Sequence, residues 1–192
     1  HILSSTYQDV RLAGNIGEPM LDTLDTADER TVFVLELSSH QLFDCRYSPH
    51  IAVMLGIVSE HLDYYPNFLS YANAKGNITK HQRPGDYFVY NPLHTFVREI
   101  AKSTAAIPVR FGVEKSAELQ AYIQRGVVTV NTNDVESPIM NLVDVPLLGN
   151  VENVLAAVTV AHLMNVPVVS IASAITPFRS LPHRLEYVGE YK

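Results

Sequence analysis

Two uninterrupted apolar runs constrain the fold more than any other feature of the chain. They are TVFVLEL, over residues 31–37, and IAVMLGIV, over residues 51–58. Strands with one face in water alternate apolar and polar residues, whereas parallel strands covered on both faces read as continuous apolar segments. Both runs are far shorter than the ~18–20 residues of a membrane span. We therefore predict two central, parallel strands of an α/β domain.

The rest of the chain alternates further short apolar segments with helical patterns, as in other α/β domains. We predict strands at 86–91, 109–113, 127–131, 139–148 and 185–188, and helices at Glu18–Leu24, Phe68–Lys80, Leu93–Lys102, Val151–Met164 and Pro167–Ile175. The polar segment NTNDVESP, at 131–138, favours an antiparallel hairpin between its flanking strands. Without a repeat or a flexible linker, the sequence predicts one domain over residues 1–192, with a mainly parallel sheet and a small antiparallel portion.

Composition narrows the function classes. The chain has 14 Lys and Arg against 20 Asp and Glu, for a formal charge of −6, and its basic residues form no run in the sequence. This balance argues against a nucleic-acid partner, which requires clustered cations. A single cysteine, Cys45, cannot form an internal disulfide, which favours a reducing, cytoplasmic setting without a membrane. The N-terminus lacks the features of a signal peptide and begins abruptly, so we expect a piece of a longer protein.

Polar residues follow both apolar runs, at the edge where ligands gather in open parallel sheets. Glu36 and Ser38 end the first run, and Glu60 and His61 end the second. If the two strands are neighbours, Glu36 and His61 offer an oxygen and a nitrogen ligand to a divalent cation. The alternative is that these polar residues only end the strands.

Lys75 is unusual because it falls on an apolar helix face. With helical spacing, it shares that face with Phe68, Tyr71 and Ile78. The lysine either extends its ammonium group to water, or is desolvated and held as a neutral amine that can react with carbon dioxide to form a carbamate. The second alternative would make one metal site from Glu36, His61 and Lys75.

Two asparagine-containing segments precede predicted helices. LAGNIGEP, at 12–19, offers backbone amides and Asn15 to an anion. GNVENVLAA, at 149–157, places Asn150 and Asn153 at a helix start, where one asparagine can simply cap the helix. The chain contains neither a G-x-x-x-x-G-K-S/T phosphate loop nor a G-x-S-x-G nucleophile motif.

The motifs LAGNIG, VLELSSHQL, SEHLDYYPNFLSYANAK, GNVENVLAA and LPHRLE, in this order, resemble the central ATPase domain of the Mur ligases. These are ATP-dependent enzymes that add amino acids to the peptidoglycan precursor, and the resemblance is greatest to the D-glutamate-adding branch. It implies a three-layer, Rossmann-like domain of the P-loop NTPase type that lacks its first phosphate-loop βα unit, the N-terminal UDP-binding domain and the C-terminal domain. It also implies ATP and Mg²⁺ as cofactors, and a UDP-muramoyl peptide and an amino acid as partners.

The resemblance assigns roles to the residues at one side of the expected site. It implies that Glu36, His61 and Lys75 bind magnesium, that Lys75 is carbamylated, and that Lys75 and His61 are catalytic. Asn15, Ser38 and His61 would contact the muramoyl substrate.

The nucleotide side of the site is implied in the same way. Asn150 and Asn153 match asparagines that recognise adenine, and Arg184 matches an arginine near the nucleotide. Gly56 and Gly149 depart from the asparagine and histidine that the family favours there, which puts local contacts in question.

Alternatives to this interpretation remain at the level of function. One is another branch of the superfamily, such as a diaminopimelate- or lysine-adding ligase or folylpolyglutamate synthase. The other is a non-catalytic scaffold domain of the same fold. We also expect the isolated chain to be inactive, because without a phosphate loop the β and γ phosphates have no cradle.

Overall fold

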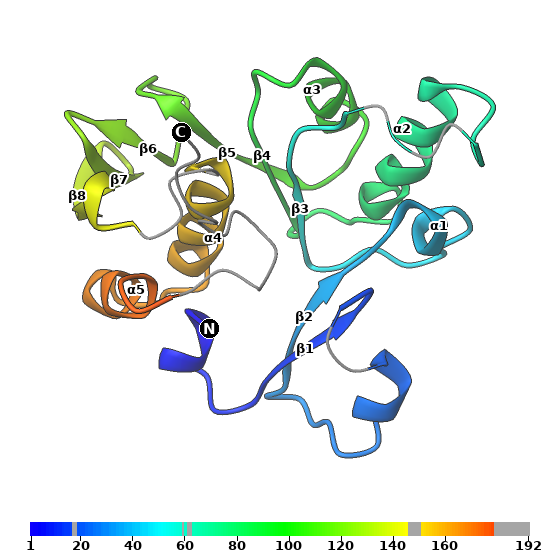
Figure 1. The fold of residues 1–192 in the computed structure, drawn as a ribbon, viewed down its shortest axis with the longest axis horizontal. Coiled ribbons are helices and arrows are strands. Elements are labelled where there is room, and N and C mark those ends of the chain that lie inside the picture. Colours follow the sequence, from blue (N-terminus) through cyan, green and yellow to red (C-terminus); the bar gives the residue numbers. More distant parts are fainter. Residues whose placement is uncertain (17–18, 59, 61–62, 146–150, 179–192) are drawn as a thin grey trace, which may run out of the picture.

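The computed structural model describes residues 1–16, 19–58, 60, 63–145 and 151–178 (Figure 1). Its strands are β1 (Val10–Gly14), β2 (Val32–Glu36), β3 (Ile51–Met54), β4 (Tyr87–Tyr90), β5 (Ile107–Glu114), β6 (Ala121–Gln124), β7 (Val127–Thr132) and β8 (Val135–Asn141). Its α-helices are α1 (Ser39–Leu42), α2 (Phe68–Gly76), α3 (Thr95–Ala101), α4 (Val151–Leu163) and α5 (Val168–Ile175). Short 3-10 turns are η1 (Leu3–Ser5), η2 (Met20–Thr23), η3 (Asn77–Thr79) and η4 (Leu142–Asp144).

The strands form two sheets. β1 and β2 make a parallel pair, and the other six follow one another in the order β3-β4-β5-β6-β7-β8. The pairs from β3 to β6 are parallel, whereas β6, β7 and β8 are antiparallel. The prediction of a mainly parallel sheet with a small antiparallel portion is confirmed.

Side chains of β4 show why helices cover both faces of the larger sheet. Val89 belongs to a core with residues of α4 and α5, whereas Phe88 and Tyr90 belong to a second core that includes Val97 of α3. Successive side chains of a strand point to opposite faces, so these two cores lie on opposite sides of the sheet. The result is the expected three-layer α/β arrangement, with α4 and α5 on one face (Figure 1).

The prediction of two central strands is wrong for the described residues. β2 pairs only with β1, and β3 is the first strand of the six-stranded sheet. Leu12 and Val34, which are register partners, are 50% and 40% exposed. An apolar run shows that a strand can be buried on both faces, but the pattern carries no information on which strands lie beside it.

The antiparallel hairpin is confirmed with different boundaries. β7 and β8 are joined by Asn133 and Asp134 alone, both with positive φ, as in the tight turns that match strand twist. The predicted turn over residues 131–138 is therefore too long, because residues 135–138 already belong to β8.

Three of the five predicted helices appear within two residues of their expected bounds, whereas the helix predicted to end at Lys80 ends at Gly76 and is followed by η3. The helix expected around Met20 is only a 3-10 turn, and β1, β6 and α1 were not predicted. The strand expected at 185–188 lies outside the described residues. Within the described part of the chain, no helix has the length and apolar character needed to cross a membrane.

Candidate active site at the carboxyl ends of the strands

The ends of β1 and β2 bring two predicted site residues together. Gly14 pairs with Glu36 in the parallel register, and the Asn15 amide donates a hydrogen bond to the Glu36 carbonyl at 2.7 Å. Gly14 has φ +110°, and a Cβ there would lie 2.3 Å from the same carbonyl oxygen. Only glycine fits this close approach without strain. The sequence segment LAGN is thus built to place Asn15 against Glu36.

The Glu36 side chain is exposed at this strand end. No side chain or amide of the described residues hydrogen-bonds to its carboxylate. A carboxylate of this kind is a suitable ligand for a hard divalent cation such as Mg²⁺. The donor chemistry at Glu36 therefore fits the predicted metal role.

Ser38 begins α1 as its N-cap. Its hydroxyl accepts a hydrogen bond from the Gln41 amide at 3.3 Å, and the Gln41 side chain in turn accepts from the Ser38 amide at 2.9 Å. This reciprocal capping box stabilises the start of a four-residue helix. Ser38 therefore has a structural role, in addition to the substrate contact that the sequence predicts for it.

Helix α1 connects the end of β2 to the segment that follows β3. The His40 ring packs edge-on against Tyr64 at 4.4 Å between centroids and lies 5.7 Å from Tyr65. The segment containing Glu36 and the segment containing Glu60 therefore meet, although β2 and β3 are not hydrogen-bonded neighbours.

The end of α2 is attached to the end of α1 by one side chain. The Asn77 amide group donates to the carbonyls of Leu42 and Phe43, both at 2.9 Å. Helices end with several carbonyls that lack a partner within the helix, and Asn77 satisfies two of them. The helix that carries Lys75 is thereby fixed to the segment that follows Glu36.

Lys75 lies in the last turn of α2 and is half-buried. Its ammonium group lies 5.2 Å from the centroid of the Tyr71 ring, a favourable cation–π arrangement. Tyr71 is buried and donates a long hydrogen bond, 3.4 Å, to Glu60. Burial and the nearby Glu60 charge raise the pKa of Tyr71. The predicted apolar stripe around Lys75 is confirmed, and the carbamate remains a prediction.

The predicted metal site is not assembled from described residues alone. His61 lies outside them, and among the residues that the structure describes no three His, Cys, Asp or Glu side chains gather around a metal-sized space. The joint site of Glu36, His61 and Lys75 therefore stays a prediction, supported by the junction of α1 with α2.

The first turn of α4 is attached to the end of β4. Asn91 is fully buried and donates to Glu152 at 3.0 Å, while His94 Nε2 lies 2.8 Å from the other Glu152 oxygen. A carboxylate only accepts, so His94 donates. Asn153 follows on α4 and is exposed, whereas Asn150 and Arg184 lie outside the described residues. The adenine-side predictions remain untested.

Sequence reasoning missed the pairing of His94 with Glu152. The signal was Gly56, because a Cβ there would lie 2.7 Å from the His94 ring. His94 also occupies the N-cap of α3 without forming a capping hydrogen bond. The sequence marked Gly56 as a departure from the family, but only the fold shows that this glycine makes room for the His94 ring.

Comparison with known proteins identifies the family. The sequence model of the family described as the Mur ligase middle domain matches residues 5–161. The chain belongs to the Mur ligase family.

Curated relatives point to one branch of the Mur ligases. The UDP-N-acetylmuramoylalanine-D-glutamate ligase of Geobacillus sp. (strain WCH70) is 39% identical over 181 residues, covering 93% of this chain and 39% of that enzyme. The enzyme of the same name from Oenococcus oeni (strain ATCC BAA-331 / PSU-1) is 34% identical, covering all of this chain and 43% of its own length. The chain thus spans about two fifths of the relatives it matches.

Solved structures of other Mur ligases share the fold. A UDP-N-acetylmuramoyl-L-alanyl-D-glutamate-2,6-diaminopimelate ligase superposes with a TM-score of 0.72 at 20% identity, covering 99% of this chain and 45% of that one. MurF ligase from Thermotoga maritima, solved in complex with ADP, gives 0.65 at 16% identity, covering 94% and 44%. These likenesses confirm the architecture.

Proposed function

We propose that this chain is the central part of an ADP-forming ligase that adds D-glutamate to UDP-N-acetylmuramoyl-L-alanine in the cytoplasm. The observation that carries the proposal is identity of 39% and 34% to two D-glutamate ligases over nearly the whole chain. The diaminopimelate ligase and the MurF ligase among the structural neighbours are only 20% and 16% identical.

The proposed reaction has two steps. A carboxylate oxygen of the substrate attacks the γ-phosphorus of ATP, so that the bond to the β–γ bridging oxygen breaks and ADP leaves. The amine of D-glutamate then attacks the acyl phosphate, loses a proton, and displaces inorganic phosphate to form the amide. Magnesium, when bound, would neutralise part of the negative charge on the transferring phosphoryl group.

Some residues at the carboxyl ends of the strands would bind the metal, and others would bind the substrate. Glu36, with His61 and a carbamylated Lys75, would hold magnesium, and the unshared carboxylate of Glu36 supports this role. Asn15, Ser38 and His61 would contact the muramoyl substrate. The 2.7 Å bond between the Asn15 amide and the Glu36 carbonyl supports a shared position for substrate and metal.

Adenine recognition is proposed for the start of α4. Asn150 and Asn153 would read the base, and Arg184 would lie near the nucleotide. The exposure of Asn153 and the attachment of Glu152 to β4 support a fixed recognition surface there. The ADP complex of MurF from Thermotoga maritima is consistent with nucleotide use by this fold.

We further propose that the isolated 192-residue chain has no ligase activity. It spans only 39–43% of its relatives and contains no G-x-x-x-x-G-K-S/T segment. A folded but inactive chain is also what a non-catalytic scaffold would be, so the isolated chain cannot discriminate between the two. The discriminating test needs the remaining parts of a ligase.

The test is a chimera in which this chain replaces the matching segment of the Geobacillus sp. (strain WCH70) enzyme. Folding is verified by circular dichroism and gel filtration, and phosphate release is measured with ATP, Mg²⁺, UDP-N-acetylmuramoyl-L-alanine and one amino acid at a time. We expect release that depends on D-glutamate and is abolished by Glu36→Gln. Release with lysine or diaminopimelate in place of D-glutamate would support another branch, and a folded chimera without release would support a scaffold.

A further inference from the structure

A groove lies at the amino ends of β3 and β4, where these two strands of the larger sheet begin. It has a volume of about 530 Å³ and is lined by Arg46, Tyr47, Ser48, His50, His81, Arg83 and Asp86. His50 immediately precedes β3, and Asp86 immediately precedes β4. The groove is therefore separated by the length of the strands from the proposed active site at their carboxyl ends.

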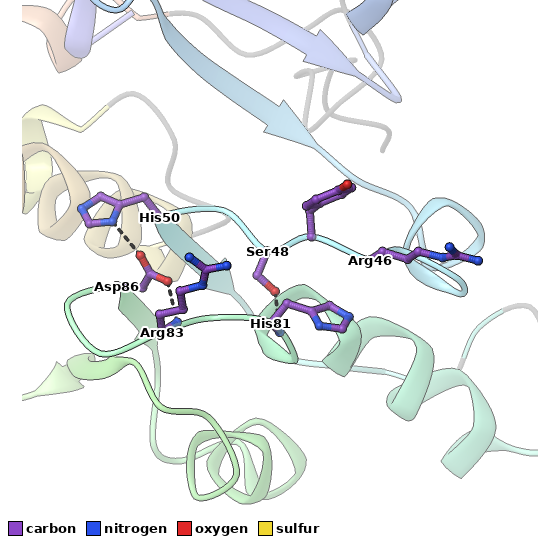
Figure 2. Close-up of a pocket in the computed structure, with 7 residues that line it drawn as sticks. Arg46, Ser48, His50, His81, Arg83 and Asp86 are labelled. Carbon is purple, nitrogen blue, oxygen red and sulfur yellow. Dashed lines mark hydrogen bonds and ion pairs between the residues drawn. The ribbon is translucent and has the colours of Figure 1, made fainter.

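The walls of the groove come from two segments that are distant in sequence, residues 46–50 and 81–86. Figure 2 shows His50, Asp86 and Arg83 at one end, Ser48 and His81 in the middle, and Arg46 at the other end. The segments are joined by the His81 amide, which donates to the Ser48 hydroxyl at 2.9 Å, and by His50 and Asp86.

The one carboxylate of the groove is already occupied. Asp86 accepts from the Arg83 amide at 2.7 Å through one oxygen and contacts His50 Nδ1 at 2.8 Å through the other. The bond from the Arg83 amide, followed by the contact with His50, lowers the pKa of Asp86. Asp86 thus stays charged and shapes the groove, while its two oxygens face protein groups.

The two guanidinium groups of the groove, in contrast to Asp86, are available to a ligand. Arg46 and Arg83 are exposed, and within the described residues neither guanidinium donates a hydrogen bond. Their fixed charges outnumber the single charge of Asp86 at neutral pH, and the lining also includes the neutral donors of the Ser48 hydroxyl and the Tyr47 phenol. Guanidinium groups bind phosphate and carboxylate oxygens through paired hydrogen bonds, and their charge does not depend on pH in the physiological range.

We propose that this groove is a second ligand site, which binds the phosphate group of a small molecule. The chemistry is shared by free inorganic phosphates and by phosphate esters. A nucleic acid fits less well, because the chain carries a net charge of −6. The site goes beyond the ligase reaction, since none of its residues is part of the proposed active site.

The test is a set of NMR titrations of the 192-residue chain with inorganic phosphate, inorganic pyrophosphate, glucose 6-phosphate and a short single-stranded oligonucleotide. We expect saturable shifts centred on the amides of Ser48, His81 and Arg83. Arg83→Gln should weaken binding about three- to tenfold, as loss of an exposed charge-assisted hydrogen bond would, and Arg46→Gln, at the other end of the groove, should have a smaller effect. Arg30→Gln is the matched control, since that arginine is 87% exposed and paired with Asp28 elsewhere.

The outcomes separate the sources of the ligand and the competing explanations. Stronger binding of glucose 6-phosphate than of phosphate points to an ester, and the reverse order points to a free phosphate ion. The proposal is overturned if shifts do not saturate, if they centre on Asn15 and Asn153, or if Arg30→Gln weakens binding as much as the groove variants. Preference for a single-stranded oligonucleotide would also overturn it. None of these outcomes depends on ligase activity, so this proposal can fail while the proposed function stands.

Discussion

Gly14→Ala is the most direct test of how the candidate active site is built. Gly14 has φ +110°, and an added Cβ would lie 2.3 Å from the Glu36 carbonyl oxygen and 3.2 Å from the Glu36 backbone nitrogen. Ordinary van der Waals contact begins near 3.4 Å, so the backbone at Glu36 would have to move by about 1 Å. The substitution therefore displaces the residue proposed to bind magnesium.

The loss of stability expected for Gly14→Ala has two separable parts. A non-glycine residue at this φ costs about 1–3 kcal/mol, and forcing a carbon into occupied space adds about 1–3 kcal/mol. Gly85 offers a matched control, because its φ is +101° but nothing lies within 4 Å of its hypothetical Cβ. Gly85→Ala should show the conformational cost alone, so Gly14→Ala should exceed it by about 1–3 kcal/mol.

Two measurements check this difference. Urea unfolding followed by circular dichroism gives the free energy of unfolding of each variant. Hydrogen exchange of the Asn15 amide reports the bond to the Glu36 carbonyl, and we expect it to accelerate in Gly14→Ala while remaining unchanged in Gly85→Ala. Equal destabilisation of the two variants, with Asn15 still protected, would refute the close approach of β1 to Glu36.

Three further predictions concern other contacts. Gly56→Ala should displace the His94 ring, change its NMR signals and cost only about 1 kcal/mol, because a side chain can move where a backbone cannot. Tyr122→Phe should lose about 1 kcal/mol at pH 7, through the lost hydrogen bond to Glu136. Burial and Glu136 raise the pKa of Tyr122 to about 12. Between pH 10 and 12 the unfolded chain therefore releases the Tyr122 proton before the folded chain does, so the free energy of unfolding of the wild type should fall over this range. Tyr122→Phe should lack that fall in urea titrations. Burial lowers the pKa of His162, so the unfolded chain binds its proton more readily; stability should fall as the pH drops below about 6.5, and His162→Gln should weaken that fall.

The sequence predicted which segments form helices and strands better than it predicted which strands lie side by side. The apolar stripe around Lys75 follows from helix periodicity, which is a local property, and it is confirmed. The burial of β2 depends on which strand lies beside it, and that is not encoded in the run TVFVLEL itself. The turn at Asn133 and Asp134 was overestimated in length because polar residues on an exposed strand face look like a loop.

The groove at the start of β3 and β4 shows a different limit. We expected no clustered cations, since the basic residues are dispersed along the chain. The fold brings Arg46 and Arg83 to one groove from segments 37 positions apart. A charge count along the sequence cannot detect a cluster that is formed only by the pairing of two loops.

The double hydrogen bond from Asn77 has a consequence for inhibition and for drug resistance. One amide group, on a residue with no proposed role in substrate binding, holds the segment after Glu36 against the helix of Lys75. A compound that wedged α1 away from α2 would break these two bonds and disturb the His40 and Phe43 ring contacts, and would so separate the two halves of the proposed metal site. Conversely, substitutions at position 77 could alter sensitivity to such a compound while leaving every residue of the proposed chemistry unchanged.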